Sequence, residues 1–281
     1  MMNKHTRKIV KLTLLNIMFI LLIAIALLPI YYALTIALSD SGSILSTELS
    51  LLPKSITLDN FKTVLFEKPF FVWLKNSSIL SGGTVIFSLC VAIPGAYAFS
   101  RFRFKGRRPA LYLLMVLNAF PAILSMFAVY RLLNIIGLIN TYVGLIIVYS
   151  GGIAVFALWN MKAYFDSIPI EIEEAAKIDG ANDRQVITRI ILPLARPSII
   201  VTAVIALIYV WNEYIFAIQF MTGADKYTLA AGLYSLQATE YTRNWPLFSA
   251  ASVLVSIPVL IIFYLIQKQM ASGLTAGSLK G

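Results

Sequence analysis

Six apolar stretches, each long enough to cross a membrane, divide this chain of 281 residues. A helix needs about 20 residues to span the hydrocarbon core of a bilayer. The stretches cover residues 12–37, 73–99, 109–130, 142–164, 198–220 and 247–267. We therefore predict an all-α membrane protein, with residues 1–281 forming a single transmembrane domain of six membrane-spanning helices.

The composition favours the same class of protein and argues against an enzyme. Apolar residues make up 59% of the chain and charged residues only 13%, with a mean hydropathy of +0.82. A soluble domain carries about 25% charged residues. The single cysteine, Cys90, excludes a disulfide within the chain, and the single histidine, His5, lies in the basic N-terminal segment. We expect no catalytic residues, no metal site and no cofactor in this chain.

The distribution of basic residues predicts how the chain is oriented. Of its 23 Lys and Arg residues, 16 fall on the face that holds both termini and 7 on the other. Cytoplasmic segments carry the excess of Lys and Arg, so both termini are predicted to be cytoplasmic. The first stretch follows a basic flank, as a signal peptide does, but it is too long and no small-residue cleavage site follows it. We interpret it as a retained helix.

A polar segment of about 30 residues, 166–196, interrupts the apolar pattern. Its acidic start suits the positive end of a helix dipole, and Gly180 stands where that helix should end. Asn182 can cap a second helix, with Gln185 three residues later reaching back to it. Pro193 is expected to end that second helix. The segment thus predicts a helix, a glycine turn and an amphipathic helix.

The segment contains the pattern E-A-A-x3-G-x9-I-x-L-P, which resembles the cytoplasmic coupling loop of permease subunits of ABC importers. In that family the loop docks onto a separate ATPase, and its glutamate contacts a basic group there. The resemblance implies that the contact is made by Glu174, Ala175, Ala176, Asp179, Gly180, Ile190, Leu192 and Pro193. The alternative is a hairpin that packs on its own transmembrane helices, with Glu173 paired to Lys177 one turn later.

The C-terminal tail, residues 271–281, is similar to that of permeases of the maltose/maltodextrin family, which take up carbohydrates. In those relatives the tail reaches between the paired ATPase subunits. The resemblance implies an ATPase contact by Gly273, Leu274, Thr275, Ala276 and Gly277. A frayed terminus is the alternative.

Two further groups of residues are candidates for contact with cargo or with an external partner. Asn212 and Glu213 lie within the fifth stretch, where a carboxylate is costly unless it faces the bundle interior or a wet cavity. They are assigned to the translocation path or its gate. Alternatively, Glu213 bonds a neighbouring helix or pairs with Arg131.

The second group lies in the last external loop. It resembles the loop that maltose-type permeases direct toward their sugar-binding protein, which implies a contact through Tyr227, Thr228, Leu229 and Gly232. The alternative is a segment that only caps the helix bundle.

The resemblance implies a permease subunit of a binding-protein-dependent ABC importer for sugars, of the maltose/maltodextrin type. Implied partners are a second homologous permease, an ATPase homodimer, an extracytoplasmic sugar-binding protein and membrane lipid, but no nucleic acid. The chain has no G-x-x-x-x-G-K-[ST] motif, so ATP is expected on the partner ATPase. The implied location is the cell membrane of a bacterium or archaeon.

Three alternatives to this function remain. The same machinery could carry another sugar, such as a galacto-oligosaccharide, another disaccharide or glycerol phosphate. An ion-coupled secondary transporter would need paired acidic residues within the spans, and only Glu213 is available. An intramembrane hydrolase would need a histidine or paired aspartates within a span, and the apolar stretches contain none.

Overall fold

The computed structural model describes residues 4–40, 55–237 and 244–278, and the side chains of residues 8–267 within those ranges. The described ranges are built of helices and contain no strand. The chain divides into two compact units, residues 1–69 with 235–256 and residues 70–234 with 257–281.

The first unit contains one long apolar helix and a short structured segment after it. Its elements are α1 (Lys4–Ala37), α2 (Asp59–Lys62), the π-helical turn η1 (Thr63–Glu67) and the start of α13 (Trp245–Ser278). The apolar side chains of α1 are exposed along most of its length. Asn60 joins α2 to the end of α1, because its amide donates to the carbonyl oxygens of Ala37 and Ser39, each at 3.0 Å.

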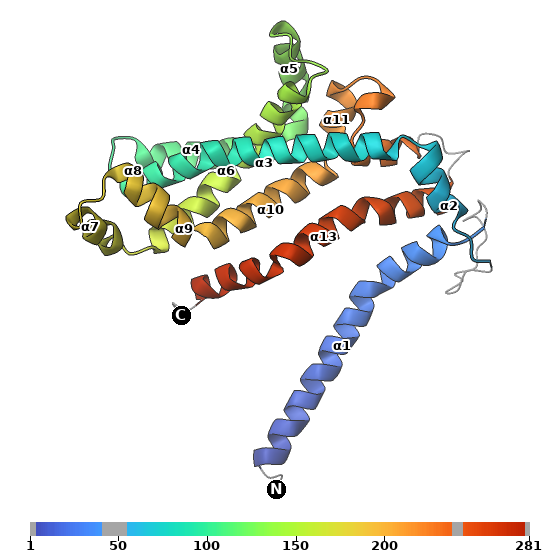
Figure 1. The fold of residues 1–281 in the computed structure, drawn as a ribbon, viewed down its shortest axis with the longest axis horizontal. Coiled ribbons are helices and arrows are strands. Elements are labelled where there is room, and N and C mark those ends of the chain that lie inside the picture. Colours follow the sequence, from blue (N-terminus) through green and yellow to red (C-terminus); the bar gives the residue numbers. More distant parts are fainter. Residues whose placement is uncertain (1–3, 41–54, 238–243, 279–281) are drawn as a thin grey trace. The chain divides into compact units, whose positions relative to one another are not determined.

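The second unit is a bundle with a group of short helices at each end (Figure 1). Its long helices are α3 (Phe70–Arg101), α4 (Arg107–Asn118), α5 (Ala122–Ile135), α6 (Tyr142–Ser167) and α10 (Arg196–Asn212). Its short elements are α7 (Glu171–Ile178), α8 (Asp183–Gln185), the π-helical η2 (Val186–Ile191), α9 (Leu192–Leu194), α11 (Ile215–Phe220), the 3-10 turn η3 (Ala224–Lys226) and α12 (Leu229–Ser235). α3, α6 and α10 run side by side, with α7 to α9 at one end and α11 at the other.

Close packing of α3 against α6 forms the centre of this unit. A Cβ atom on Gly83 would lie 2.5 Å from Cδ1 of Ile146, and one on Gly95 would lie 3.2 Å from Cδ1 of Leu158. Small residues at such positions let two helix backbones approach closely. The two helices therefore pack closely at two positions along their length.

Within the described ranges, four helices are long and apolar enough to cross a membrane, or up to six when two bent pairs are each counted as one span. The four cover Lys8–Ala37, Phe70–Arg101, Tyr142–Ser167 and Trp245–Gln267. The pair α4 and α5 is bent by 95°, and the pair formed by Asp183–Leu194 and α10 is bent by 71°.

Two of the six predicted stretches are interrupted rather than continuous. Stretch 109–130 breaks before Pro121, which stands at the N-cap of α5 with an extended backbone; proline has no N–H to continue the preceding helix. Stretch 198–220 breaks at Glu213, which is also extended and separates α10 from α11. The apolar pattern alone did not reveal either break.

Candidate functional site

The polar segment between α6 and α10 is organised around a left-handed glycine. Gly180 follows α7 with φ of +90°, a conformation that glycine adopts without a steric penalty. Its N–H donates to the carbonyl of Lys177 at 3.0 Å, and the N–H of Ala181 donates to the carbonyl of Ala176 at 2.9 Å. This pair of hydrogen bonds is a Schellman motif, which satisfies carbonyls at the end of α7.

The second helix starts with the capping arrangement that the spacing predicts. The backbone N–H of Gln185 donates to Asn182 Oδ1, and the N–H of Asn182 donates to Gln185 Oε1, both at 2.9 Å. Val186 and Ile191 are fully buried on the inner face of this helix. The helical run Asp183–Leu194 ends one residue after Pro193, at a bend of 71° before α10, close to where the proline was expected to end it. Pro193 follows the π-helical turn η2.

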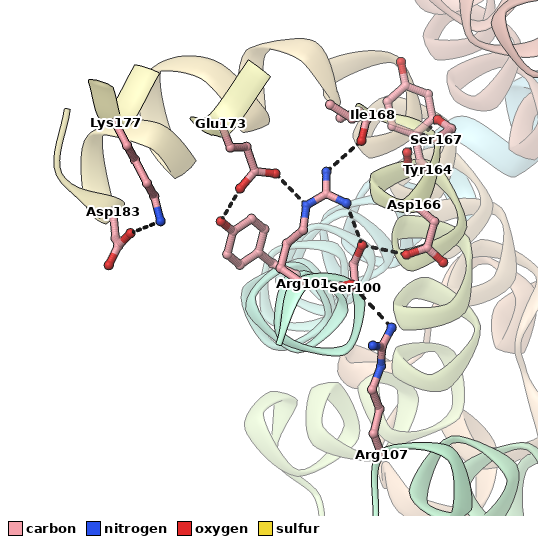
Figure 2. A network of polar contacts seen from close by, with 11 residues as sticks. Ser100, Arg101, Arg107, Tyr164, Asp166, Ser167, Ile168, Glu173, Lys177 and Asp183 are labelled. Atoms are coloured by element: carbon pink, nitrogen blue, oxygen red, sulfur yellow. Dashed lines mark hydrogen bonds and ion pairs between the residues drawn. The ribbon is translucent and has the colours of Figure 1, made fainter. Parts of the chain in front are cut away.

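The inner face of α7 carries a buried carboxylate (Figure 2). Glu173 is 5% exposed and is the only buried residue of α7. Its Oε2 accepts a hydrogen bond of 2.7 Å from the hydroxyl of Tyr97, and its Oε1 lies 2.5 Å from Nε of Arg101. Both donors lie at the end of α3, four residues apart. The Glu173 carboxylate therefore attaches α7 to that helix.

Arg101 also binds the end of α6. Its Nη2 donates to the carbonyl oxygen of Ile168 at 2.9 Å, and its Nη1 donates to Oγ of Ser100 at 3.3 Å. The Ser100 hydroxyl donates in turn to Asp166 at 2.6 Å. One guanidinium group thus contacts the ends of α3, α6 and α7.

The outer face of α7 is exposed in the described part of the chain. Glu174, Ala175, Asp179 and Gly180 are exposed, and Ile178 is 87% exposed. Ala176 is half-buried. Of the remaining residues assigned to the ATPase contact, Ile190 and Leu192 are half-buried and Pro193 is exposed. Within the E-A-A motif, Glu174 and Ala175 therefore lie on the outer face of α7, and Ala176 lies between the outer and the inner face.

Lys177 is paired differently from the expected alternative. Its Nζ lies 2.8 Å from Oδ1 of Asp183 on α8, and both side chains are largely exposed. The hydrogen bond to Asp183, with the charge of that carboxylate, raises the pKa of Lys177. Because Glu173 is paired with Arg101 and Lys177 with Asp183, the pair of Glu173 with Lys177 that the alternative assumed does not form. The hairpin does pack on its own bundle, as that alternative held, but only through its inner face.

Asn212 and Glu213 lie at the break between α10 and α11. The Asn212 amide donates to the carbonyl of Ile208 at 2.8 Å, one turn back on its own helix. Glu213 bonds the hydroxyl of Tyr149 on α6 and the backbone N–H of Phe216. Of the two structural alternatives for Glu213, contact with a neighbouring helix is the one observed.

The residues assigned to a binding-protein contact lie mostly against α3. Thr228, Leu229 and Gly232 are buried, and only Tyr227 is half-exposed. The N–H of Leu229 donates to Oγ of Ser77 at 2.8 Å. The buried side chains of Thr228 and Leu229 therefore pack against the bundle, as those of a capping segment would, and Gly232 lets α12 approach Trp73 closely. The contact with a binding protein through this loop stays a prediction.

The tail residues Gly273 to Gly277 lie within the helical backbone of α13. Their side chains lie outside the described residues, and so do residues 279–281. The tail contact stays a prediction.

Sequence reasoning missed Tyr97 and Arg101. Their spacing of four residues places them on one face of a helix, which was a visible signal. Their acceptor lies 72 residues beyond Arg101, and no local pattern connects the two segments.

Comparison with known proteins places this architecture in a family. Residues 86–275 match the family model of the binding-protein-dependent transport system inner membrane component. The galactooligosaccharides transport system permease protein GanQ of Bacillus subtilis is 34% identical over 282 residues, covering 99% of each chain. The maltose/maltodextrin transport system permease protein MalG of Vibrio parahaemolyticus is 36% identical over 253 residues, covering 83% of this chain and 84% of its own.

A solved structure supports the same assignment. It is a bacterial ABC transporter involved in the import of the acidic polysaccharide alginate, and one of its chains matches with a TM-score of 0.75 and 28% identity. The match covers 95% of this chain and 98% of that one. From the length of the family match and the coverage of these relatives, this chain is an integral membrane protein that belongs to the inner membrane components of binding-protein-dependent transport systems.

Proposed function

We propose that this chain is the membrane-spanning permease subunit of an ABC importer of sugars, and that it docks a separate ATPase through α7. The observation that carries the proposal is the division of the E-A-A segment into two faces. Glu173 faces the chain's own bundle, whereas Glu174, about 100° further round the helix, is exposed. A chain that lacks a phosphate-binding loop needs such a surface to receive energy from ATP.

The exposed face of α7 indicates the chemistry of the docking partner. Glu174 suits a charge-assisted hydrogen bond to an arginine or lysine. The small side chain of Ala175 lets another backbone approach closely. Ile178, one turn after Glu174, is 87% exposed and offers an apolar surface. A cleft with one basic group beside an apolar hollow fits this face. The C-terminal tail, including residues 273–277, is proposed to make a second contact with the ATPase.

The proposed assembly follows from the resemblance and from the family. Six spans in one permease domain form half of a translocation pathway, so a second permease completes it. An ATPase homodimer binds ATP on the cytoplasmic side, where α7 and both termini lie. An extracytoplasmic binding protein delivers the sugar. Closure of the ATPase dimer displaces α7 and shifts the bundle between inward-facing and outward-facing states.

We propose maltose/maltodextrin-type oligosaccharides as the cargo, with galacto-oligosaccharides as the second candidate. The names of GanQ and MalG give these two sugar classes. Galacto-oligosaccharides stay a candidate because the match to GanQ covers 99% of each chain. Uptake of maltotriose compared with that of a galactobiose, in vesicles holding the whole complex, decides between them.

The test of the docking surface is a pull-down of the tagged chain from detergent, followed by mass spectrometry. We expect wild type to retain a second permease and an ATPase, and Glu174→Lys to lose the ATPase alone. Glu171→Lys is the matched control, because it makes the same charge change in the first turn of the same helix. It should retain the ATPase.

Two results would contradict the proposal. A wild-type chain that is recovered alone, yet transports after reconstitution, would remove the ABC assignment. Equal loss of the ATPase in both variants would show that the helix dipole matters rather than Glu174.

A further inference from the structure

α7 is a surface helix attached to the bundle by a buried polar contact, beside the half-buried Ala176 that packs against the apolar core. Such a helix normally buries an apolar stripe, whereas the one buried residue of α7 is Glu173. Tyr97 and Arg101 supply both donors to its carboxylate, and the side chains of Arg101 and Glu173 in this pair are 10% and 6% exposed. A charge is buried in this way only when it is paired and hydrogen-bonded.

A hydrogen-bonded ion pair of this kind constrains both the separation and the relative orientation of α7 and α3. Apolar surfaces can slide past one another with little loss, because their attraction is not directional. The Glu173 carboxylate cannot slide, since separation from Arg101 would leave a buried charge without a partner. The cost of breaking this buried pair favours movement of α7 together with the end of α3.

Arg101 extends the connection to a second transmembrane helix. Its Nη2 bonds the carbonyl of Ile168 directly after α6. Further along, α3 and α6 pack in close contact at Gly83 and Gly95. Figure 2 shows Arg101 between Glu173 of α7 and Ile168 after α6. The arginine therefore links α7 to two helices that pack closely against each other.

We propose that Glu173 is a positioning residue that transmits movement of α7 to α3 and α6, while its neighbour Glu174 binds the ATPase. Adjacent glutamates then have separate tasks, one on each face of a single helix. The inference rests on the proposed function, because it takes the ATPase as the source of the movement.

The test uses the only cysteine of the chain, Cys90, which is exposed and lies on α3 itself. The chain is labelled there with an environment-sensitive bimane and reconstituted with cysteine-free partner subunits. Three quantities are measured: recovery of the ATPase, the rate of ATP hydrolysis, and the change in bimane fluorescence when ATP is added. None of them depends on knowing the sugar.

For Glu173→Gln we expect recovery of the ATPase and ATP hydrolysis close to wild type. The ATP-dependent fluorescence change should fall about tenfold, within the ~5–150-fold range typical of coupling between sites. Tyr97→Phe removes one hydrogen bond and keeps the ion pair, so it should give an intermediate signal. Lys177→Met is the matched control, because it breaks an exposed ion pair in the same segment and should leave all three quantities unchanged.

A double-mutant cycle separates transmission from general damage. If Glu173 and Arg101 act as one unit, Glu173→Gln with Arg101→Gln should lower the signal no further than either change alone. Additive losses would overturn the proposal, as would an unchanged signal in Glu173→Gln. Loss of the ATPase with Glu173→Gln would assign that residue to docking or stability instead. Failure of the wild-type chain to retain an ATPase would contradict the proposed function, which is a different result.

Discussion

The hydroxyl of Tyr149 on α6 donates a hydrogen bond of 2.5 Å to Glu213 at the break between α10 and α11. Tyr149 is 1% exposed. The second carboxylate oxygen of Glu213 accepts from the N–H of Phe216 at 3.0 Å, in the first turn of α11. One carboxylate therefore holds the interrupted helix against its neighbour, which accounts for an ionisable residue in an apolar stretch.

We expect Glu213→Ala to lower the free energy of unfolding by about 1–3 kcal/mol, because it leaves the buried Tyr149 hydroxyl without an acceptor. Glu213→Gln keeps an oxygen in place and should lower it less. Thermal unfolding of the purified chain in detergent measures both. Equal losses in the two variants would show that the hydrogen bond does not hold the break.

The same pair of variants tests the assignment of Glu213 to the translocation path. If Glu213 also contacts the cargo, Glu213→Gln should slow uptake while the unfolding temperature stays near that of wild type. If the role is structural alone, uptake should follow stability across the glutamine and alanine variants.

Gly232 on α12 is predicted to be intolerant of any side chain. A Cβ atom there would lie 2.3 Å from Cδ2 of the Trp73 indole and 2.4 Å from its Cε3. Because Trp73 is 4% exposed, the ring has little room to move. Gly232→Ala should therefore lower the free energy of unfolding by about 1–3 kcal/mol, as overpacked cores do.

The control for this variant is Gly82→Ala on α3, where a Cβ atom would meet nothing within 4 Å. Alanine is the better helix former, so this change should be neutral or stabilising by up to about 1 kcal/mol. Thermal unfolding of the two variants in parallel separates crowding from the general effect of a methyl group. A stable Gly232→Ala chain would mean that α12 does not pack on Trp73 as described.

Local rules predicted the turn between α7 and α8 well. Gly180 takes the left-handed conformation, and Asn182 and Gln185 form the capping box, because each depends only on residues within one helical turn. The same rules placed the end of the second helix within one residue of Pro193 but did not predict the π-helical turn before it. Capping and turn chemistry can thus be read from neighbours in sequence, whereas a shift in helix type cannot.

Contacts between residues far apart in the sequence account for the features that the sequence alone did not predict. The alternative considered for the polar segment paired Glu173 with Lys177 four residues away, but Glu173 is paired with Arg101 from another helix. The apolar character of residues 198–220 was plain, yet the break at Glu213 depends on Tyr149, 64 residues away. The burial of Leu229 against α3 has no local signature either. These features share one property: each partner is distant in sequence.

The turn at Gly180 allows a prediction that does not depend on the ATPase. A Cβ atom at this position would meet nothing within 4 Å, so any penalty comes from the backbone conformation alone. An L-residue held at this φ costs about 1–2 kcal/mol. Valine should suffer most, since branched residues are genuine outliers at positive φ, whereas asparagine tolerates this region. Hydrogen exchange of the Ala181 amide, which closes the cap by bonding to Ala176, should be faster in Gly180→Val than in Gly180→Asn, which should stay near wild type. Equal protection in the two variants would show that the left-handed turn is not what holds the end of α7.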